Sequence, residues 1–553
     1  MTASVRILGI EGTAWAASAA VFDAESDDVF IESDAYQPES GGIHPREAAE
    51  HMHDAVPAVV ERALEYARET DDGPETEPPV DAVAFSRGPG LGPCLRIVGT
   101  AARALSQALS VPLVGVNHMV AHLEIGRHTS GFEAPVCLNA SGANAHLLAY
   151  RNGRYRVLGE TMDTGVGNAI DKFTRHVGWS HPGGPKVERA AEDGKYVDLP
   201  YVVKGMDFSF SGIMSAAKQA ADDGVPVADV CYSLQENIFG MLTEVSERAL
   251  SLTGSDELVL GGGVGQNARL REMLATMCEQ RGAQFHAPQP RFLRDNAGMI
   301  AVLGAKMYDA GDTIAIEESR VDSDFRPDQV PVTWRTNEPA LTAGRGVDET
   351  RVRGAEALVD IDRDGGRVTK RRESKRYRHP TLDDRLQRER TTLEARLTSQ
   401  ARREGVPTPV LTDVDPREAR LEFEYVGDCD LRDGLTVERV RDVGRHLARL
   451  HAAGIVHGDP TTRNVRVSHP ERNRAECERE DERTYLIDFG LGYHTDHVED
   501  YAMDLHVFDQ SLVGTADDPE PLREAVRSGY AEVGNDRVLE RLQDVEGRGR
   551  YQS

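Results

Sequence analysis

Cysteine is scarce in this chain. The 553 residues include only six cysteines, and no two of them form a CxxC pair. Disulfide-rich secreted scaffolds and zinc ribbons need closely spaced cysteines, so the sequence disfavours both classes and fits a reducing cytoplasm. No uninterrupted apolar run reaches about 18 residues, the length that a membrane-spanning helix requires. The start of the chain, MTASVRILGIEGT, has no basic stretch followed by an apolar core, so we expect no signal peptide. These absences predict a cytoplasmic protein without membrane attachment.

Lysine is also rare. Only eight of the 64 basic residues are lysine, and 92 acidic residues bring the formal net charge to −28. An acidic surface that uses arginine in place of lysine favours a halophilic source, because high salt screens the self-repulsion. An ordinary acidic enzyme is the alternative. The charge argues against nucleic-acid binding over the whole surface but allows a local basic patch, such as the run at 367–378.

The length predicts more than one domain, since single domains usually span 50–250 residues. The first part of the chain is rich in glycine, and short apolar strands alternate with alanine-rich helices, which predicts an α/β fold. A stretch rich in proline and polar residues then follows. We therefore expect a first domain at 1–325, a linker at 326–346 and a second domain at 347–553.

Three segments of the first domain carry glycine where a strand ends. They are VRILGIEGT (5–13), PVCLNASGANAHLLAY (135–150) and ELVLGGGVGQNARLREML (257–274). Backbone N–H groups at such turns can approach a phosphate. The third segment also fits a dinucleotide-binding pattern, but the next strand does not end in the required acidic residue. Two strand–glycine–strand turns and a glycine-rich adenosine element are typical of the duplicated ATPase core of actin, Hsp70-type chaperones and sugar kinases.

Two histidines, His118 and His122, are spaced to share one face of a helix. Such a pair can ligate one metal ion, although two surface histidines are the common alternative. Residue 119 is methionine, so this is not the HExxH motif of a metalloprotease. Asp295, just before a later helix, could complete a set of two imidazoles and one carboxylate, which suits Fe(II) or Zn(II) with open positions for substrate.

Nine ordered motifs then resemble one family over nearly the whole first domain. They are GGIHPREAAEHMHD (41–54), SRGPGLGPCLRIVG (86–99), NHMVAH (117–122), ASGANAH (140–146), GNAIDKFTR (167–175), PGGPKVERAA (182–191), DFSFSGIMSAAK (207–218), LGGGVGQN (260–267) and RDNAGMIA (294–301). This segment resembles the TsaD-type (Kae-type) tRNA threonylcarbamoyladenosine transferases. The resemblance implies transfer of a threonylcarbamoyl group from threonylcarbamoyl-AMP to the N6 amine of the adenosine beside the anticodon, in tRNAs that read A-starting codons.

The resemblance also implies a set of site residues. His118, His122 and Asp295 would hold the metal, and the adenylate site would be lined by Asn139, Ala140, Ser141, Gly142, Ala143, Asp171, Gly184, Glu188 and Asn267. Two positions depart from the family pattern. Asn139 stands where many archaeal relatives have a tyrosine that ligates the metal, and Ala143 stands where a second glycine is common. The identity of the metal is therefore open, and no general base for the amine is evident.

The second domain carries the motifs of a protein kinase. HGDPTTRN (457–464) and IDFG (487–490) reproduce the catalytic loop and the metal-binding aspartate. They assign Asp459 as the residue that accepts the substrate proton, and Asn464 and Asp488 as Mg²⁺ ligands. Lys370, at the end of a hairpin strand, would orient the ATP phosphates and pair with Glu389 of the following helix. The nucleotide-covering loop has a single glycine, Gly354, and no APE segment follows.

This domain resembles the small Bud-type atypical kinases, which are relatives of PRPK and RIO kinases. The matching segments include GAEA (354–357), KRYRHPTLDDRLQRERT (375–391) and the terminal EGRGRYQS. The resemblance implies an ATPase or switch that acts on the transferase within a KEOPS complex, with Ser/Thr protein kinase activity as the second interpretation. The implied partners are tRNA at its anticodon loop, other KEOPS-type subunits and ATP with Mg²⁺.

Two functions of other classes stand against this interpretation. One is a chaperone-like ATPase of the actin and Hsp70 fold, associated with a kinase and without transfer chemistry. The other is a secreted-type metalloprotease, suggested by HxxxH, which the missing glutamate and missing signal peptide disfavour.

Overall fold

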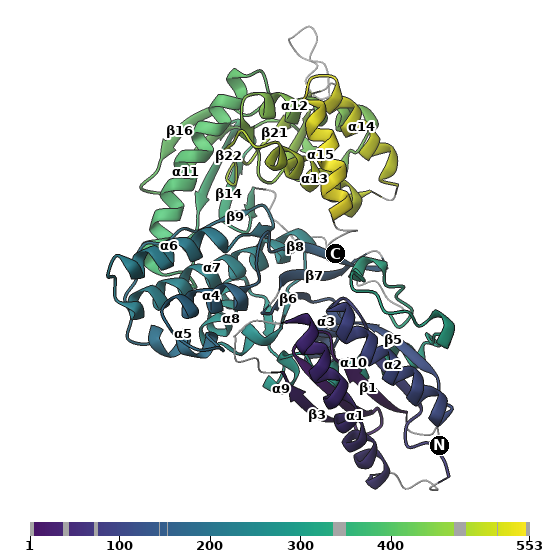
Figure 1. Ribbon diagram of the computed structural model, residues 1–553. Helices are drawn as coiled ribbons and strands as arrows, with labels where there is room; N and C mark the ends of the chain where they lie inside the picture. The colour runs from purple at the N-terminus through teal and green to yellow at the C-terminus, as the bar shows by residue number, and fades with distance from the viewer. Residues whose placement is uncertain are drawn as a thin grey trace. The chain divides into compact units, whose positions relative to one another are not determined.

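The structure of the chain is a computed structural model (Figure 1). It describes residues 5–36, 44–70, 76–142, 144–151, 153–335, 350–468, 483–516 and 518–548. Apart from the C-terminal residue, the chain divides into two compact units. Unit 1 consists of Met1–Ala343 with Arg376–Arg378, and unit 2 of Gly344–Lys375 with His379–Gln552.

Unit 1 begins with a five-stranded sheet in the order β3-β2-β1-β4-β5. Its strands are β1 (Arg6–Glu11), β2 (Ala16–Asp23), β3 (Asp28–Ala35), β4 (Ala82–Gly88) and β5 (Leu113–Asn117). The first three strands form an antiparallel meander, and β4 and β5 add to β1 in parallel. Helices α1 (Pro45–Glu69) and α2 (Gly92–Leu109) make the connections to the parallel strands.

A second five-stranded sheet repeats this connectivity. Its strands are β6 (Val136–Ala140), β7 (Ala145–Arg151), β8 (Arg154–Glu160), β11 (Glu257–Gly261) and β12 (Gln284–His286). Here too the first three strands form an antiparallel meander, and the last two join the first strand in parallel. The repeated order confirms the duplicated α/β core that the glycine turns predicted.

Helices of the second half lie between these strands and after them. They are α4 (Val166–His176), α5 (Gly184–Ala191), α6 (Ser211–Asp222), α7 (Val227–Thr253), α8 (Ala268–Arg281), α9 (Pro290–Leu293) and α10 (Ala297–Asp309). A short ribbon of β9 (Val203–Lys204) and β10 (Asp207–Phe208) and three 3₁₀ helices, η1 (Gly263–Gln266), η2 (Ile316–Glu318) and η3 (Pro327–Gln329), complete unit 1. The long α7 is buried along most of its length.

Two helices connect the halves of unit 1. Helix α3 (His118–Ser130) follows the last strand of the first sheet but packs on β6 and β11 of the second, and α10 follows the last strand of the second sheet but packs on β1 of the first. The helices also contact each other. A Cβ at Gly9 of β1 would lie 2.5 Å from the Ala297 carbonyl oxygen, so only glycine permits this approach. The duplication thus brings the starts of two equivalent helices together.

The first part of the expected linker at 326–346 packs on unit 1. Residues 326–335 are described, and they include the helix η3 and the buried Val330, which belongs to the core beside Phe292 and Ile300. The Arg335 guanidinium lies 3.9 Å from the centre of the Tyr150 ring. The expected boundary at 325 is therefore too early. The apolar side chains of this segment are too widely spaced to show a period, but they are buried by packing.

A buried ionic cluster fixes this region. Glu124 is fully buried and accepts hydrogen bonds from Tyr155, Arg127 and Lys306, the last at 2.9 Å. Burial would raise the pKa of Glu124, but Lys306 and Arg127 lower it to about 2. The carboxylate is therefore charged at all working pH values.

Replacing Glu124 by glutamine is expected to lower the free energy of unfolding by about 2–4 kcal/mol, because it leaves the half-buried Arg127 and Lys306 without their buried counter-ion. Chemical unfolding in high-salt buffer measures this loss. The exposed Glu61 on α1 provides the control, and Glu61→Gln should change the stability by less than about 0.5 kcal/mol. Equal stabilities for the two variants would contradict the account.

Asp207 on β10 makes stability depend on pH. Burial and the neighbouring Glu160 raise the pKa of Asp207 to about 7, although the backbone N–H of Glu160 opposes the shift. The unfolded chain ionises this residue at lower pH than the folded chain does. Stability is therefore lost as the pH rises from about 4 to about 7. We expect Asp207→Asn to be more stable than the parent protein at pH 8 and to lose this advantage at pH 4, in thermal melts at constant salt. An equal difference at both pH values would contradict this assignment.

Unit 2 begins with a five-stranded antiparallel sheet in the order β13-β14-β15-β17-β16. Its strands are β13 (Arg351–Arg353), β14 (Ala357–Asp362), β15 (Arg367–Arg372), β16 (Leu411–Asp415) and β17 (Arg420–Glu424), and α11 (Pro380–Arg403) follows β15. The predicted hairpin is present, since β14 and β15 pair on either side of the turn at 363–366. This lobe has the strand-rich composition of the smaller lobe of a kinase.

The rest of unit 2 is mostly helical. It contains α12 (Val437–Ala452), α13 (Val498–Thr515), α14 (Glu520–Ala531) and α15 (Asp536–Arg548), with short strands β18 (Cys429–Asp430), β19 (Ile455–Val456), β20 (Val465–Ser468), β21 (Arg483–Leu486) and β22 (Tyr493–His494) and the 3₁₀ helix η4 (Leu431–Asp433). One apolar core joins these helices to the short strands. Unit 2 is thus a small two-lobed α+β domain. Across the described ranges of both units, every helix is too short or too polar to cross a bilayer.

Candidate functional site

The metal-site histidines lie at the first turns of α3. Strand β5 ends at Asn117, whose side chain caps the helix by accepting a hydrogen bond from the Val120 N–H at 3.1 Å. The Asn117 amide also donates to the Phe325 carbonyl oxygen at 2.8 Å. These two bonds fix the start of the helix, and with it the directions of His118 and His122.

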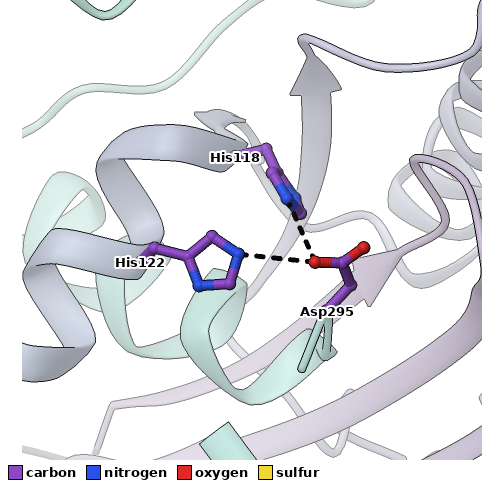
Figure 2. Close-up of side chains that lie close together, drawn as sticks. All are labelled: His118, His122 and Asp295. Carbon is purple, nitrogen blue, oxygen red and sulfur yellow. Dashed lines mark ion pairs between the residues drawn. The ribbon is translucent and has the colours of Figure 1, made fainter. Parts of the chain in front are cut away.

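Asp295 joins the two histidines from the loop before α10. Figure 2 shows both imidazoles turned toward one carboxylate oxygen, and each Nε2 lies 3.4 Å from Asp295 Oδ1. The imidazole rings are nearly perpendicular, with centres 4.9 Å apart. One donor atom from each of the three residues lies within 4.8 Å of the others. The structure therefore brings together the three residues predicted as metal ligands.

Glu11 at the end of β1 is a fourth residue of this cluster, and no sequence pattern reveals it. It is fully buried, and its Oε2 lies 3.1 Å from His118 Nδ1, while its Oε1 accepts from the Thr13 N–H. Burial would lower the pKa of His118, but Glu11 and Asp295 raise it to about 10. Burial lowers the pKa of His122. Glu11 orients His118 in the way that outer carboxylates orient metal-bound histidines.

The residues present fit a divalent cation. His122 is 1% exposed, and neither of its ring nitrogens makes a hydrogen bond. A buried imidazole without a hydrogen bond is costly unless a ligand completes it. Two imidazoles and a carboxylate that share one point form the donor set of Fe(II) and Zn(II) sites. A cation there would also balance the two carboxylates of Asp295 and Glu11.

A cleft of about 1410 Å³ opens over the histidine cluster, lined by residues of both halves of unit 1. Most of the predicted adenylate residues line it, namely Asn139, Ser141, Gly142, Asp171, Gly184, Glu188 and Asn267. Ala140 does not, because its side chain is buried within β6. The assignment of Ala140 to the adenylate site stays a prediction, in which only its backbone could take part. Ala143 lies outside the described residues.

The floor of the cleft depends on a close approach of backbones. The Asn168 N–H donates to the Gly142 carbonyl at 2.9 Å, and a Cβ at Gly167 would lie 2.7 Å from the Gly142 Cα. Asp171 on α4 accepts from the Gly183 N–H at 2.7 Å and so holds the loop before α5. The glycines of both motifs thus permit contacts that side chains would block.

Two predicted residues have structural partners of their own. Glu188 accepts from the Ala268 N–H at 2.8 Å. Asn267 caps α8 by accepting from Arg269 and Leu270, and its amide donates to Gln235 at 2.9 Å. Both side chains still line the cleft, so they position the start of α8 at its wall.

Three other residues of the cleft were missed from the sequence. Trp15 and His181 come from opposite halves of unit 1, and their rings stack with centres 5.4 Å apart. His146 on β7 is 3% exposed and lines the cleft without a hydrogen bond to either ring nitrogen. The ASGANAH motif contained His146, but alternation along a strand did not distinguish it from a core histidine.

In unit 2, Lys370 contacts Asp488 of the IDFG motif and Glu394 of α11. Its Nζ lies 2.7 Å from Glu394 Oε1 and 2.6 Å from Asp488 Oδ1. Burial would lower the pKa of Lys370, but Asp488 and Glu394 raise it above its ordinary value. Lys370 therefore stays charged.

The prediction that Glu389 pairs with Lys370 is wrong. Glu389 is exposed on α11, and Glu394 takes the inward position. The buried face of α11 includes polar residues such as Asp383, Thr391 and Thr398. The buried face of α11 is therefore centred away from its line of leucines. That line of leucines predicts that Glu389 faces inward.

The catalytic loop is held by hydrogen bonds and a positive-φ glycine. Asn464 Nδ2 donates to the Asp459 carboxylate at 2.9 Å. Asp504 on α13 accepts from the backbone N–H groups of His457 and Gly458, and Gly458 has φ +82°. Asp488 also has a positive φ, 65°. These bonds order the loop that carries Asp459 and Asn464, whose roles in ATP turnover, like that of Asp488, stay predictions.

The loop between β13 and β14 contains Gly354, whose N–H donates to the Ala357 carbonyl at 2.8 Å. Glu356 of the same loop pairs with the buried Arg372 at 2.8 Å and with Arg390 at 2.6 Å. Arg372 also pairs with Glu394. Part of the basic run at 367–378 is therefore internal to the fold and not available to nucleic acid.

Glu394→Gln is expected to lower ATP turnover by unit 2 by at least about tenfold, because it removes the counter-ion that positions Lys370. Glu389→Gln is the matched control on the same helix and should retain the parent rate. Steady-state phosphate release from the full-length protein measures both. A loss with Glu389→Gln and none with Glu394→Gln would contradict the pairing.

Known proteins match this chain over almost its whole length. The family model of TsaD, tRNA N6-adenosine threonylcarbamoyltransferase, matches residues 27–302. A relative from Haloarcula marismortui, described as a probable bifunctional tRNA threonylcarbamoyladenosine biosynthesis protein, is 68% identical over 99% of this chain and 100% of its own length. The chain belongs to this bifunctional family. A member from Methanospirillum hungatei with the same description is 50% identical over 99% of both chains.

Among solved structures, the chain is also similar to the Rio2 kinase–ADP/Mg²⁺–phosphoaspartate complex from Chaetomium thermophilum. The identity is 16%, the TM-score is 0.25, and the match covers 37% of this chain and 71% of that one. The TsaD match lies within unit 1, and the bifunctional relatives extend through both units. The resemblance of the first domain to the TsaD family is therefore confirmed.

Proposed function

We propose that unit 1 transfers the threonylcarbamoyl group of threonylcarbamoyl-AMP to the N6 amine of the adenosine next to the anticodon in tRNAs reading A-starting codons. The observation that carries the proposal is the cluster of His118, His122 and Asp295 at the cleft of a TsaD-type core. The amine nitrogen attacks the carbamoyl carbon and forms the new C–N bond. The bond to the phosphate oxygen breaks, AMP leaves with the electron pair, and the amine gives its proton to solvent.

His118, His122 and Asp295 would hold one Fe(II) or Zn(II) ion, with Glu11 orienting His118. The ion, when bound, stabilises the negative charge of the leaving phosphate. The backbone N–H of Gly142, in a turn that lines the cleft, would offer a further donor to the adenylate. Asp171 and Glu188 lie at the same wall of the cleft, where ribose hydroxyls would be bound. Asn139 stands at the place where many archaeal relatives have a ligating tyrosine.

Unit 2 is, in this proposal, a Bud-type atypical kinase that hydrolyses ATP or phosphorylates Ser/Thr side chains. Lys370 and Glu394 would position the phosphates, Asn464 and Asp488 would bind Mg²⁺, and Asp459 would accept the substrate proton. Gly354 lies in the loop that would cover the nucleotide. Turnover of ATP there would act as a switch on transfer.

We further propose that other KEOPS-type subunits assist the reaction and that the protein works in the cytoplasm of a halophilic cell. The net charge of −28 and the scarcity of lysine support the high-salt environment. Salt weakens phosphate contacts steeply, so tRNA recognition would depend mainly on shape and on base contacts in the anticodon loop.

The test supplies full-length protein with Fe(II) or Zn(II), threonylcarbamoyl-AMP and unmodified tRNA at high salt, with and without KEOPS-type partners. Mass spectrometry of the digested tRNA should detect N6-threonylcarbamoyladenosine beside the anticodon. Absence of that nucleoside under every condition, with ATP hydrolysis retained, would favour the chaperone-like ATPase instead.

A further inference from the structure

His146 is a buried histidine of the cleft without a partner. It lies on β7, opposite Asn139 of β6 in the antiparallel register, and it is 3% exposed. Neither ring nitrogen makes a hydrogen bond, and the side chain lines the cleft together with His118 and Asp295. A neutral imidazole carries one N–H donor and one acceptor. Leaving these groups buried without a hydrogen bond is unfavourable unless a ligand or water completes them.

Asn139 is a second buried polar side chain with an atom that makes no hydrogen bond. Asn139 is 4% exposed, and its Oδ1 accepts no hydrogen bond. A Cβ at Gly262 would lie 2.5 Å from this oxygen, and Gly262 has φ +82°, so the glycine turn packs against the amide without giving it a hydrogen bond. Two neighbouring strands thus place a donor–acceptor pair beside the metal-ligand cluster.

His146 is separate from the metal ligands. Among the described residues, the group whose donor atoms lie within 4.8 Å of one another consists of His118, His122 and Asp295. Burial, followed by the nearby His122 and His118, lowers the pKa of His146 to about 3. A neutral ring in this place is suited to donate a hydrogen bond and not to transfer a proton.

We propose that His146 is a catalytic residue whose ring N–H donates a hydrogen bond to the carbonyl oxygen of the threonylcarbamoyl group. The inference rests on the proposed function. When the amine attacks the carbamoyl carbon, the π electrons of the C=O bond move to its oxygen, and the hydrogen bond stabilises the charge that develops. The oxygen returns the electrons as the C–O bond to AMP breaks. His146 keeps its proton throughout.

The kinetic test compares His146→Phe, which keeps a flat ring without nitrogen, with His146→Gln, which keeps a donor. We expect kcat for transfer to fall about 10²–10³-fold in the phenylalanine variant, with unchanged metal content and a KM for tRNA within about threefold. The glutamine variant should recover at least about tenfold of that loss. Parent-like kcat in His146→Phe, or loss of its metal, would overturn the proposal.

A binding measurement separates this inference from the function on which it rests. Calorimetry of the full-length protein would use a non-hydrolysable threonylcarbamoyl-adenylate analogue and, as the matched ligand, AMP, which lacks the carbamoyl oxygen. His146→Phe should weaken analogue binding about tenfold and leave AMP binding unchanged. Equal losses for both ligands, or none for the analogue, would overturn the hydrogen bond even if transfer itself is observed.

The same two variants also show whether a loss of transfer comes from misfolding. Thermal melts should show His146→Gln within a few degrees of the parent protein. If His146→Phe does not fold, His146→Gln and His146→Leu replace the comparison. A leucine variant that transfers as fast as the glutamine variant would contradict the need for a donor.

Discussion

Replacing His122 by alanine is expected to abolish metal binding and to lower threonylcarbamoyl transfer by at least about 100-fold. His122 is 1% exposed, lies 3.4 Å from Asp295 and has no other partner for its ring nitrogens. Its loss leaves the proposed ion with one imidazole and one carboxylate. Inductively coupled plasma mass spectrometry of protein purified in high salt measures the metal, and nucleoside analysis measures transfer.

His128 provides the matched control for this prediction. It lies on the same helix, and its Nε2 pairs with Asp27 at 2.8 Å, away from the cluster. His128→Ala should keep the metal content and the transfer rate of the parent protein. If His122→Ala also keeps its metal, the assignment of the site to this cluster fails.

Replacing Asp488 by asparagine is expected to lower ATP turnover by at least about 100-fold. The substitution removes the carboxylate that would bind Mg²⁺ and that now lies 2.6 Å from Lys370 Nζ. Phosphate release, measured with ATP and Mg²⁺ on the full-length chain, reports this activity. The metal content of unit 1 should not change, because its ligands belong to a different unit.

Asp496 is the control for the kinase prediction. It follows Asp488 by a few residues and is exposed, so Asp496→Asn should retain the parent turnover. Undiminished ATP hydrolysis in Asp488→Asn would place the ATPase activity in unit 1 and would overturn the proposed role of unit 2.

The duplicated core and the histidine site could be predicted because their signals are local. Glycine turns at strand ends, a four-residue histidine spacing and Asp295 before a helix are all visible along the chain. The structure adds the reason that they meet. Helices α3 and α10 occupy equivalent places after the two sheets, and each packs on the other half of unit 1.

What could not be predicted depends on contacts between distant segments. Glu11 has no pattern that marks it, and only the folding of the chain brings the end of β1 to His118 at the start of α3. The leucine positions of α11 predict that Glu389 faces inward, but buried polar residues move the centre of the buried face, and Glu394 pairs with Lys370. Residues 326–335 have no periodicity, but Val330 and Arg335 are fixed by the core and the Tyr150 ring.

The most direct test of the central proposal is the modified-nucleoside profile of tRNA from cells whose only copy of this protein carries His118→Ala. The account predicts that N6-threonylcarbamoyladenosine disappears from tRNAs that read A-starting codons, while other modified nucleosides remain at parental levels. An unchanged level of N6-threonylcarbamoyladenosine in that strain would contradict the proposal that this metal-ligand cluster performs the transfer.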